Sequence, residues 1–194
     1  PPRSTLFPYT TLFRSGKLFV AGHGKGGAIA LLAAARRPEV RGVLCMSSVS
    51  TLLRFPPRLR SELLAQGSIA VVAPLSGQRV RLSRGLLDEV EGDPEGFSLQ
   101  EAVQALRAPV VFIHGEEDLE VSVKESESLY HWSRKDRTRL VLMEKVGHAF
   151  GAEHPFKASN KELERVVEIF GSFIDQTLAA GPAGEPPLSS SGPG

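Results

Sequence analysis

The chain has 194 residues, with 23 Lys and Arg against 22 Asp and Glu, so its formal net charge is +1, and 41% of its residues are hydrophobic. This is the composition of a globular protein, and the length suits one domain. A charge this close to zero gives no electrostatic reason to expect nucleic acid or an anionic membrane as a partner. The single cysteine, Cys45, excludes an internal disulfide framework and a multi-cysteine zinc site. No apolar run approaches the roughly 18 residues that a membrane helix needs.

Both ends of the chain differ in character from the rest. Residues 5–15 (TLFPYTTLFRS) match the translation of a widely used sequencing adapter, so residues 1–15 are interpreted as non-native and excluded from the fold argument. Residues 181–194 (GPAGEPPLSSSGPG) have few apolar side chains, which predicts a disordered tail. The native N-terminus is then missing, which leaves localisation open, with the cytoplasm favoured.

Residues 16–180 predict alternating strands and helices. Continuous apolar runs, typical of strands buried on both faces of a parallel sheet, occur at 18–21, 42–46, 109–113 and 140–143. Helices are expected at 28–37, before Pro38, and after the N-cap candidates Ser98, Ser122 and Ser159. The sequence therefore predicts an α/β fold, a parallel sheet of about four strands with helices on both faces. Residues 51–105 break the rhythm with several prolines and are interpreted as a lid-like insertion.

A glycine-rich segment, Gly22-His23-Gly24-Lys25-Gly26-Gly27, lies between the first strand and the first helix. Its glycines fit the dinucleotide fingerprint G-x-G-x-x-G, but no acidic residue follows strand 42–46 to hold a ribose. The segment also fits a nucleophile elbow, G-x-S-x-G, in which Gly24 takes the nucleophile position. Glycine has no side chain, so it cannot attack a substrate.

Two further segments follow later strands. Asp118, in the segment HGEED, comes just after strand 109–113, at the edge of a parallel sheet where site chemistry is placed. The neighbouring acids Glu116, Glu117 and Glu120 are interpreted as a solvated turn. His148, in the segment GHAF, follows the fourth strand and is a candidate general base. The order of elbow, acid and histidine is the chain order of the α/β-hydrolase triad.

The segments GHGKGG, HGEED and GHAFGAEHPF together resemble the C-terminal part of an α/β-hydrolase, of the dienelactone hydrolase and prolyl-oligopeptidase-like esterase and peptidase group, over residues 16–178. The resemblance implies a partial α/β-hydrolase fold, a small-molecule ester or peptide substrate, and no metal or cofactor. It implies a serine at position 24, Asp118 as the orienting acid and His148 as the base. It also implies that the backbone N–H of Lys25 forms half of an oxyanion hole. Gly24 departs from the pattern.

Two consequences follow from the resemblance. The strands that precede the elbow strand in the family are missing, so strand 18–21 is expected at an open, apolar edge of the sheet. Without a nucleophile and with half of the oxyanion hole, the chain is expected to be inactive or nearly so. A single-base codon change converts serine to glycine, so a sequence error and a genuine glycine both stay open.

Two other functions remain as alternatives, namely a non-catalytic binding or interaction domain and, less favoured, a nucleotide-binding module. The oligomeric state is left open. Among the other polar side chains, Ser47, Ser48 and Ser50 are not favoured as substitute nucleophiles. Cys45 is expected to be a buried, inert thiol.

Overall fold

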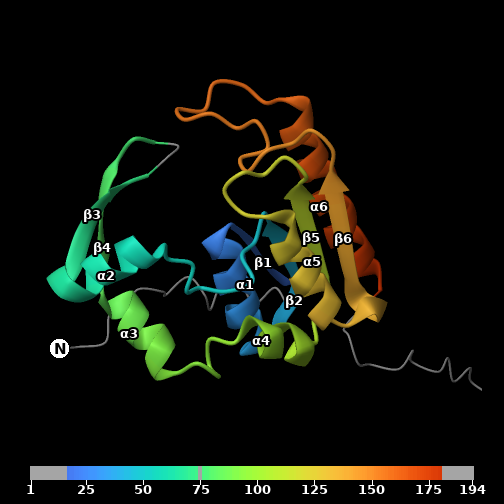
Figure 1. Cartoon of the computed structure of the whole chain (residues 1–194). Helices are drawn as coiled ribbons and strands as arrows, with labels where there is room; N and C mark the ends of the chain where they lie inside the picture. The colour runs from blue at the N-terminus through green and yellow to red at the C-terminus, as the bar shows by residue number, and fades with distance from the viewer. Residues whose placement is uncertain (1–16, 74–75, 181–194) are drawn as a thin grey trace, which may run out of the picture.

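A four-stranded parallel sheet forms the centre of the protein in a computed structural model that describes residues 17–73 and 76–180 (Figure 1). The strands lie side by side in the order β1-β2-β5-β6, and every neighbouring pair is parallel. The expectations for residues 1–15 and 181–194 lie outside the described residues. The strands are β1 (Leu18–His23), β2 (Val40–Met46), β5 (Val110–Gly115) and β6 (Thr138–Met143).

Burial on both faces of the sheet explains the apolar runs at residues 42–46 and 110–113 in the two central strands. Every residue of β5 is buried, because helices cover both faces of the sheet at this position. Side chains alternate between the two faces, as the pleat of a strand requires. In β2 and β5, Cys45 and Phe112 belong to one core cluster, whereas Leu44 and Val111 belong to the other. The predicted parallel sheet is therefore confirmed.

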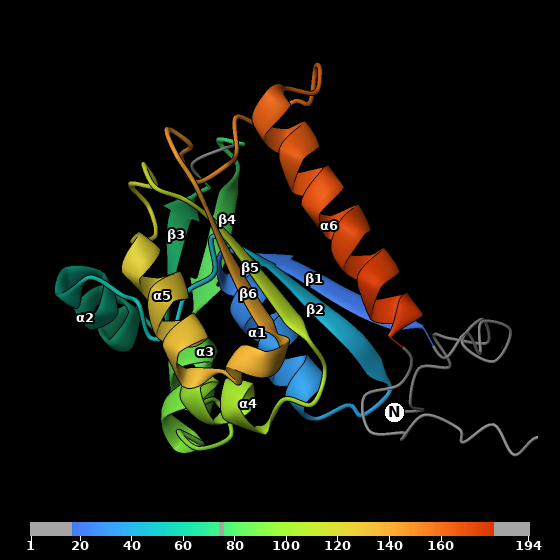
Figure 2. The same ribbon diagram turned by 90° about the vertical axis from the view of Figure 1, so that its right-hand side faces the viewer.

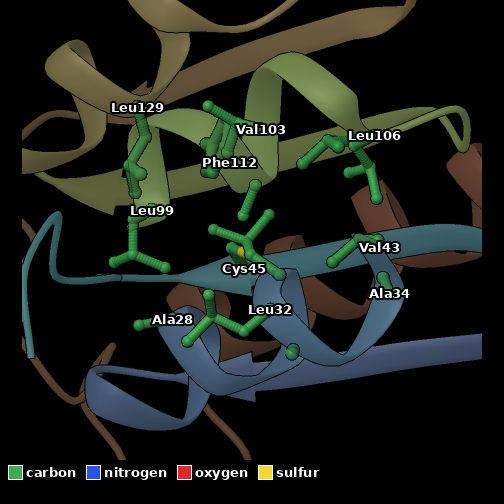
Figure 3. Close-up of a cluster of buried hydrophobic side chains, with 14 of the residues drawn as sticks. Ala28, Leu32, Ala34, Val43, Cys45, Leu99, Val103, Leu106, Phe112 and Leu129 are labelled. Carbon is green, nitrogen blue, oxygen red and sulfur yellow. The ribbon is translucent and has the colours of Figure 1, made fainter. Parts of the chain in front are cut away.

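Helices pack on both faces of this sheet, as predicted. The helix α6 (Lys161–Ala179) runs along one face, and three helices cover the opposite face (Figure 2). Figure 3 shows the cluster on that opposite face, where Cys45 and Phe112 of the sheet meet Leu32 of α1 and Val103 of α4. The three helices are α1 (Lys25–Ala35), α4 (Leu99–Ala105) and α5 (Val123–Trp132).

Between β2 and α4 the chain forms a small unit beside the sheet, at the left of Figure 1. It has its own buried cluster, formed by Leu63, Ile69 and Leu87. The helix α4 lies inside the predicted insertion range 51–105, but it packs against α1 in the main core. A lid-like role for the unit stays a prediction. The elements of this unit are α2 (Pro57–Gln66), an antiparallel hairpin of β3 (Ser68–Val72) and β4 (Arg79–Ser83), and α3 (Gly85–Gly92).

Two of the three predicted helix caps are confirmed. The hydroxyl groups of Ser98 and Ser122 accept backbone hydrogen bonds at the starts of α4 and α5. The prediction for Ser159 is wrong, because Asn160 caps α6, where its Oδ1 accepts the N–H of Leu163 at 2.8 Å. Asparagine is as good an N-cap as serine. The capping-box pattern therefore placed the start of the helix one residue too early.

The strand β1 lies at the edge of the sheet. Within residues 17–73 and 76–180 it pairs with β2 alone, and Leu18 is 41% exposed. This placement agrees with the expected open, apolar edge.

None of the helices in the described part of the chain combines the length and the apolarity needed to cross a membrane.

Two glycines in the turn from β1 into α1 differ in how closely they are packed. A Cβ on Gly22 would lie 2.1 Å from the carbonyl oxygen of Gly26, whereas a Cβ on Gly26 would meet nothing within 4 Å. We therefore expect Gly22→Ala to lower the free energy of unfolding by about 3 kcal/mol, and Gly26→Ala to raise it by up to about 1 kcal/mol. Urea denaturation of both variants measures the difference, and equal effects would contradict the close approach.

Candidate active site

Three loops meet at the carboxyl ends of the parallel strands. Because β1, β5 and β6 are parallel, their carboxyl ends lie at the same edge. Gly24 follows β1 directly, Asp118 lies in the loop after β5, and His148 lies in the loop after β6. The sheet therefore brings together the three positions that the sequence singled out.

Gly24 forms a sharp turn that points at His148. Its φ of 56° lies in the left-handed region, and its N–H donates to the carbonyl oxygen of Met46 at 2.9 Å. A Cβ on residue 24 would lie 3.7 Å from both Nε2 and Cε1 of His148, an ordinary van der Waals distance. A side chain at position 24 would thus face the imidazole, although a non-glycine residue in this conformation is strained by about 1–3 kcal/mol.

Asp118 and His148 form a hydrogen-bonded pair. His148 Nδ1 donates to Asp118 Oδ2 at 2.8 Å, and the Asp118 side chain is fully buried while that of His148 is 14% exposed. Asp118 Oδ1 accepts the N–H groups of Glu120 at 2.9 Å and Val121 at 2.8 Å. Because Asp118 holds Nδ1, the other nitrogen, Nε2, faces position 24.

The pKa of Asp118 is set by two opposing effects. Burial of the carboxyl group raises its pKa, but hydrogen bonds from the Val121 N–H, His148 and the Glu120 N–H lower it by more. The net shift is downward, so the group is ionised at neutral pH. An ionised Asp118 can stabilise a protonated His148.

A second histidine contacts the same carboxylate from the interior. His114 is completely buried, with Nδ1 2.6 Å from Ser126 Oγ and Nε2 2.9 Å from the Val121 carbonyl oxygen. Its Nε2 also lies 3.2 Å from Asp118 Oδ2. His114 lies near the end of β5. No sequence pattern marks this contact, since it depends on how the loop after β5 turns back.

His23 holds the loop of His148 in place. Its Nε2–H donates to the His148 carbonyl oxygen at 2.9 Å, and the two rings lie 4.3 Å apart between centroids. Burial lowers the pKa of His23, and the nearby His148 lowers it further, against the opposing effect of this hydrogen bond. His23 is therefore neutral at pH 7 and acts as a hydrogen-bond donor.

The start of α1 faces the same edge of the sheet. Since the helix begins at Lys25, its first N–H groups have no acceptor within the helix. The Gly27 N–H is already used by the Gly24 carbonyl oxygen, at 3.2 Å. The Lys25 ammonium lies over the Phe55 ring, 4.5 Å from its centroid. The location of the Lys25 N–H at the start of α1 is compatible with the predicted role as an oxyanion donor, which stays a prediction.

The other polar candidates have structural partners. Ser47 Oγ is 3.4 Å from the His148 carbonyl oxygen, Ser48 Oγ is 3.3 Å from the Val49 carbonyl oxygen, and Ser50 Oγ donates to Glu125. None of the three hydroxyl groups has His148 Nε2 as a hydrogen-bond partner. Cys45 is buried, and burial raises its pKa, in agreement with the expected inert thiol. Within the described residues, no group of three His, Cys, Asp or Glu side chains is arranged to hold a metal.

Comparison with known proteins supports the fold. No protein-family model and no curated protein matches the chain. Solved structures do match, among them the esterase domain of a Rhodothermus marinus protein, with 19% identity, a TM-score of 0.59, and coverage of 81% of this chain and 60% of that one. The described residues have part of the α/β-hydrolase fold.

Two lipases show the same likeness. A soluble variant of monoglyceride lipase from Saccharomyces cerevisiae, in complex with a substrate analogue, has 19% identity and a TM-score of 0.61, over 82% of this chain and 62% of that one. A monoacylglycerol lipase from Paleococcus ferrophilus has 16% identity and a TM-score of 0.60, over 82% of this chain and 68% of that one. The chain thus spans about 60% of the length of the first esterase and between 62% and 68% of the two lipases.

The buried contacts of His114 predict a loss of stability on its removal. We expect His114→Leu to lower the free energy of unfolding by about 1–3 kcal/mol, because Ser126 and the Val121 carbonyl oxygen lose a buried partner. The same substitution at His131, which is exposed on α5, should change it by less than about 0.5 kcal/mol. Urea denaturation of both variants provides the comparison, and equal losses would argue against the buried network.

The lowered pKa of Asp118 predicts a pH dependence of stability. A carboxyl group whose pKa is lower in the folded state contributes stability above its unfolded pKa, about 4, and loses it as the pH falls through the folded pKa. The difference in unfolding free energy between the original chain and Asp118→Asn should therefore be largest above about pH 4 and shrink toward pH 2. Urea titrations across this range measure it, and a constant difference would contradict the assignment.

Proposed function

We propose that residue 24, Asp118 and His148 form the acyl-transfer centre of a serine-hydrolase-type protein in which Gly24 occupies the nucleophile position. The chain as it stands keeps the general base and its carboxylate but forms no acyl-enzyme. The chemistry for which this centre is arranged is hydrolysis of an ester or peptide bond.

One observation carries the proposal. The Cβ position of residue 24 lies 3.7 Å from His148 Nε2, while His148 Nδ1 donates to the buried Asp118 at 2.8 Å. A serine Oγ extends about 1.4 Å beyond Cβ, which brings it within the reach of roughly 2.6–3.2 Å that nucleophile and base require. With serine at this position, His148 would take the hydroxyl proton as Oγ attacks a carbonyl carbon, and Asp118 would stabilise the imidazolium.

The substrate class follows from the cavity and from the similar structures. A cavity of about 410 Å³ lies against His148 and is lined by Met46, Phe150 and Leu163 among others. Such a wall suits an apolar acyl or aryl group. The similar structures are named as an esterase domain and two lipases, which favours an ester over a peptide. Membership of the dienelactone hydrolase or prolyl-oligopeptidase-like group, and the status of the chain as a C-terminal fragment, are further parts of this proposal.

A non-catalytic binding domain is the second candidate, and the missing nucleophile beside a cavity of about 410 Å³ favours it. The two candidates make different predictions for a serine at position 24, because a catalytic centre should form a covalent adduct there and a binding domain should not. Nucleotide binding is less favoured. Packing already accounts for Gly27, since a Cβ there would lie 2.7 Å from Ser48 Oγ, so its glycine needs no phosphate ligand.

Restoring the hydroxyl group tests the proposal directly. We expect Gly24→Ser to react with a fluorophosphonate and to hydrolyse a neutral aryl ester about 10³-fold faster than the original chain. Intact-mass spectrometry detects the covalent adduct, and release of the phenol gives the rate. Both should disappear in Gly24→Ser/His148→Ala.

Gly24→Ala is the matched control, because alanine has the same backbone strain as serine but no hydroxyl group. Both variants should unfold about 1–3 kcal/mol more easily than the original chain, and only the serine variant should react. Labelling of the original chain or of Gly24→Ala would show that another residue is the nucleophile. A folded Gly24→Ser chain without label or turnover would overturn the catalytic proposal in favour of a binding domain.

A further inference from the structure

The cavity beside His148 has one acidic wall. Apolar side chains, including Met46, Phe150 and Leu163, line most of it, and Ala73 and Ser76 of the β3–β4 hairpin close one side. Glu120 lines the same cavity, with its Oε2 3.9 Å from His148 Nε2. A carboxylate thus lies beside the nitrogen that would act as the base.

The position of Glu120 is fixed by its backbone. Its N–H donates to Asp118 Oδ1 at 2.9 Å, and its carbonyl oxygen accepts a hydrogen bond from Arg54 Nη2 at 3.2 Å. The side chain is half-exposed, so the carboxylate is hydrated and its field is partly screened. It can change rotamer, but its Cα stays at the mouth of the cavity because both flanking peptide groups are held.

No cation among the described lining residues neutralises Glu120. The nearby Arg54 pairs with Glu125, at 3.2 Å, and the Lys25 ammonium lies over the Phe55 ring; neither side chain lines the cavity. The other ionisable lining groups are His23 and His148. Burial lowers the pKa of His23, which favours its neutral form, and His148 can act as a base only in its neutral form. A substrate therefore meets an apolar cavity with a net negative charge beside the reacting atoms.

We infer that Glu120 makes this centre select esters that carry a positive charge near the scissile bond and disfavour esters that carry a carboxylate there. The inference rests on the proposed function, since it places the scissile carbonyl next to residue 24 and His148. A substrate charge about 6 Å from Glu120, in a largely aqueous dielectric, changes kcat/KM by roughly three- to tenfold in either direction. The selection weakens as salt is added.

Three acetyl thioesters of similar size test this selection: acetylthiocholine with a positive charge, 3,3-dimethylbutyl thioacetate without charge, and S-acetyl-3-mercaptopropionate with a negative charge. In the Gly24→Ser chain, thiol release should give kcat/KM values in that order, separated by about three- to tenfold at each step. Adding Glu120→Gln should bring the three values within about twofold of one another. Adding Glu120→Lys should reverse the order.

Glu117→Gln is the matched control. Glu117 is exposed in the same acidic turn but does not line the cavity, so its substitution should leave the order unchanged. The inference fails if the Glu120→Gln background keeps the order, or if the three thioesters are hydrolysed equally by the Gly24→Ser chain. Hydrolysis of the neutral thioester reports on the proposed function separately, since it does not depend on the charge of residue 120.

A binding measurement on the original chain makes the inference independent of turnover. Titration of each intact thioester, followed by the NMR signals of the His148 ring, should give dissociation constants in the same order of charge. The same titration with the Glu120→Gln chain should remove that order. Equal affinities of the original chain for the cationic and the anionic thioester would overturn the inference even if no variant turns over.

Discussion

The geometry of the site depends on the hydrogen bonds that the ionised carboxylate of Asp118 accepts. This carboxylate accepts hydrogen bonds from two backbone N–H groups of its own loop and from His148 in the loop after β6, and His114 approaches it from the interior. Without these donors a buried carboxylate would be protonated or displaced, because its desolvation is costly. The same contacts therefore keep the loop in shape, keep the group charged and hold one tautomer of His148.

Much of the fold could be predicted from the sequence, because burial on both faces leaves a direct record in composition. Residues 42–46 of the interior strand β2 and residues 110–113 of β5 are unbroken apolar runs. The parallel arrangement then brings Gly24, Asp118 and His148 together at the carboxyl ends of the strands, although 93 residues lie between the first two. The motif segments, their chain order and their position after a strand together selected these three, and the last two properties follow from topology rather than from side-chain detail.

What the sequence could not provide are the contacts that depend on loop shape. Glu120 was interpreted as part of a solvated acidic turn, yet it lines the cavity beside His148. His114 had no visible partner, because Ser126 comes from a separate helix and Asp118 reaches it only after the loop reverses. The hairpin of β3 and β4 was also missed. Its strands are short and largely exposed, so they lack the apolar signal of the main sheet.

The edge position of β1 has a consequence for how long the site stays assembled. Asp118 and His148 follow the adjacent strands β5 and β6, whereas Gly24 follows a strand that pairs on one side only within the described residues. Movement of β1 away from β2 would carry position 24 away from the imidazole and would break the hydrogen bond from His23 to the His148 carbonyl oxygen, whereas the contact between Asp118 and His148 does not involve β1. The alignment then has an opening equilibrium of its own, lower in free energy than global unfolding and visible in amide exchange. A segment that paired along the free side of β1 would slow this movement. Strand pairing at the outer edge of the sheet would then set the fraction of molecules in which position 24 faces His148.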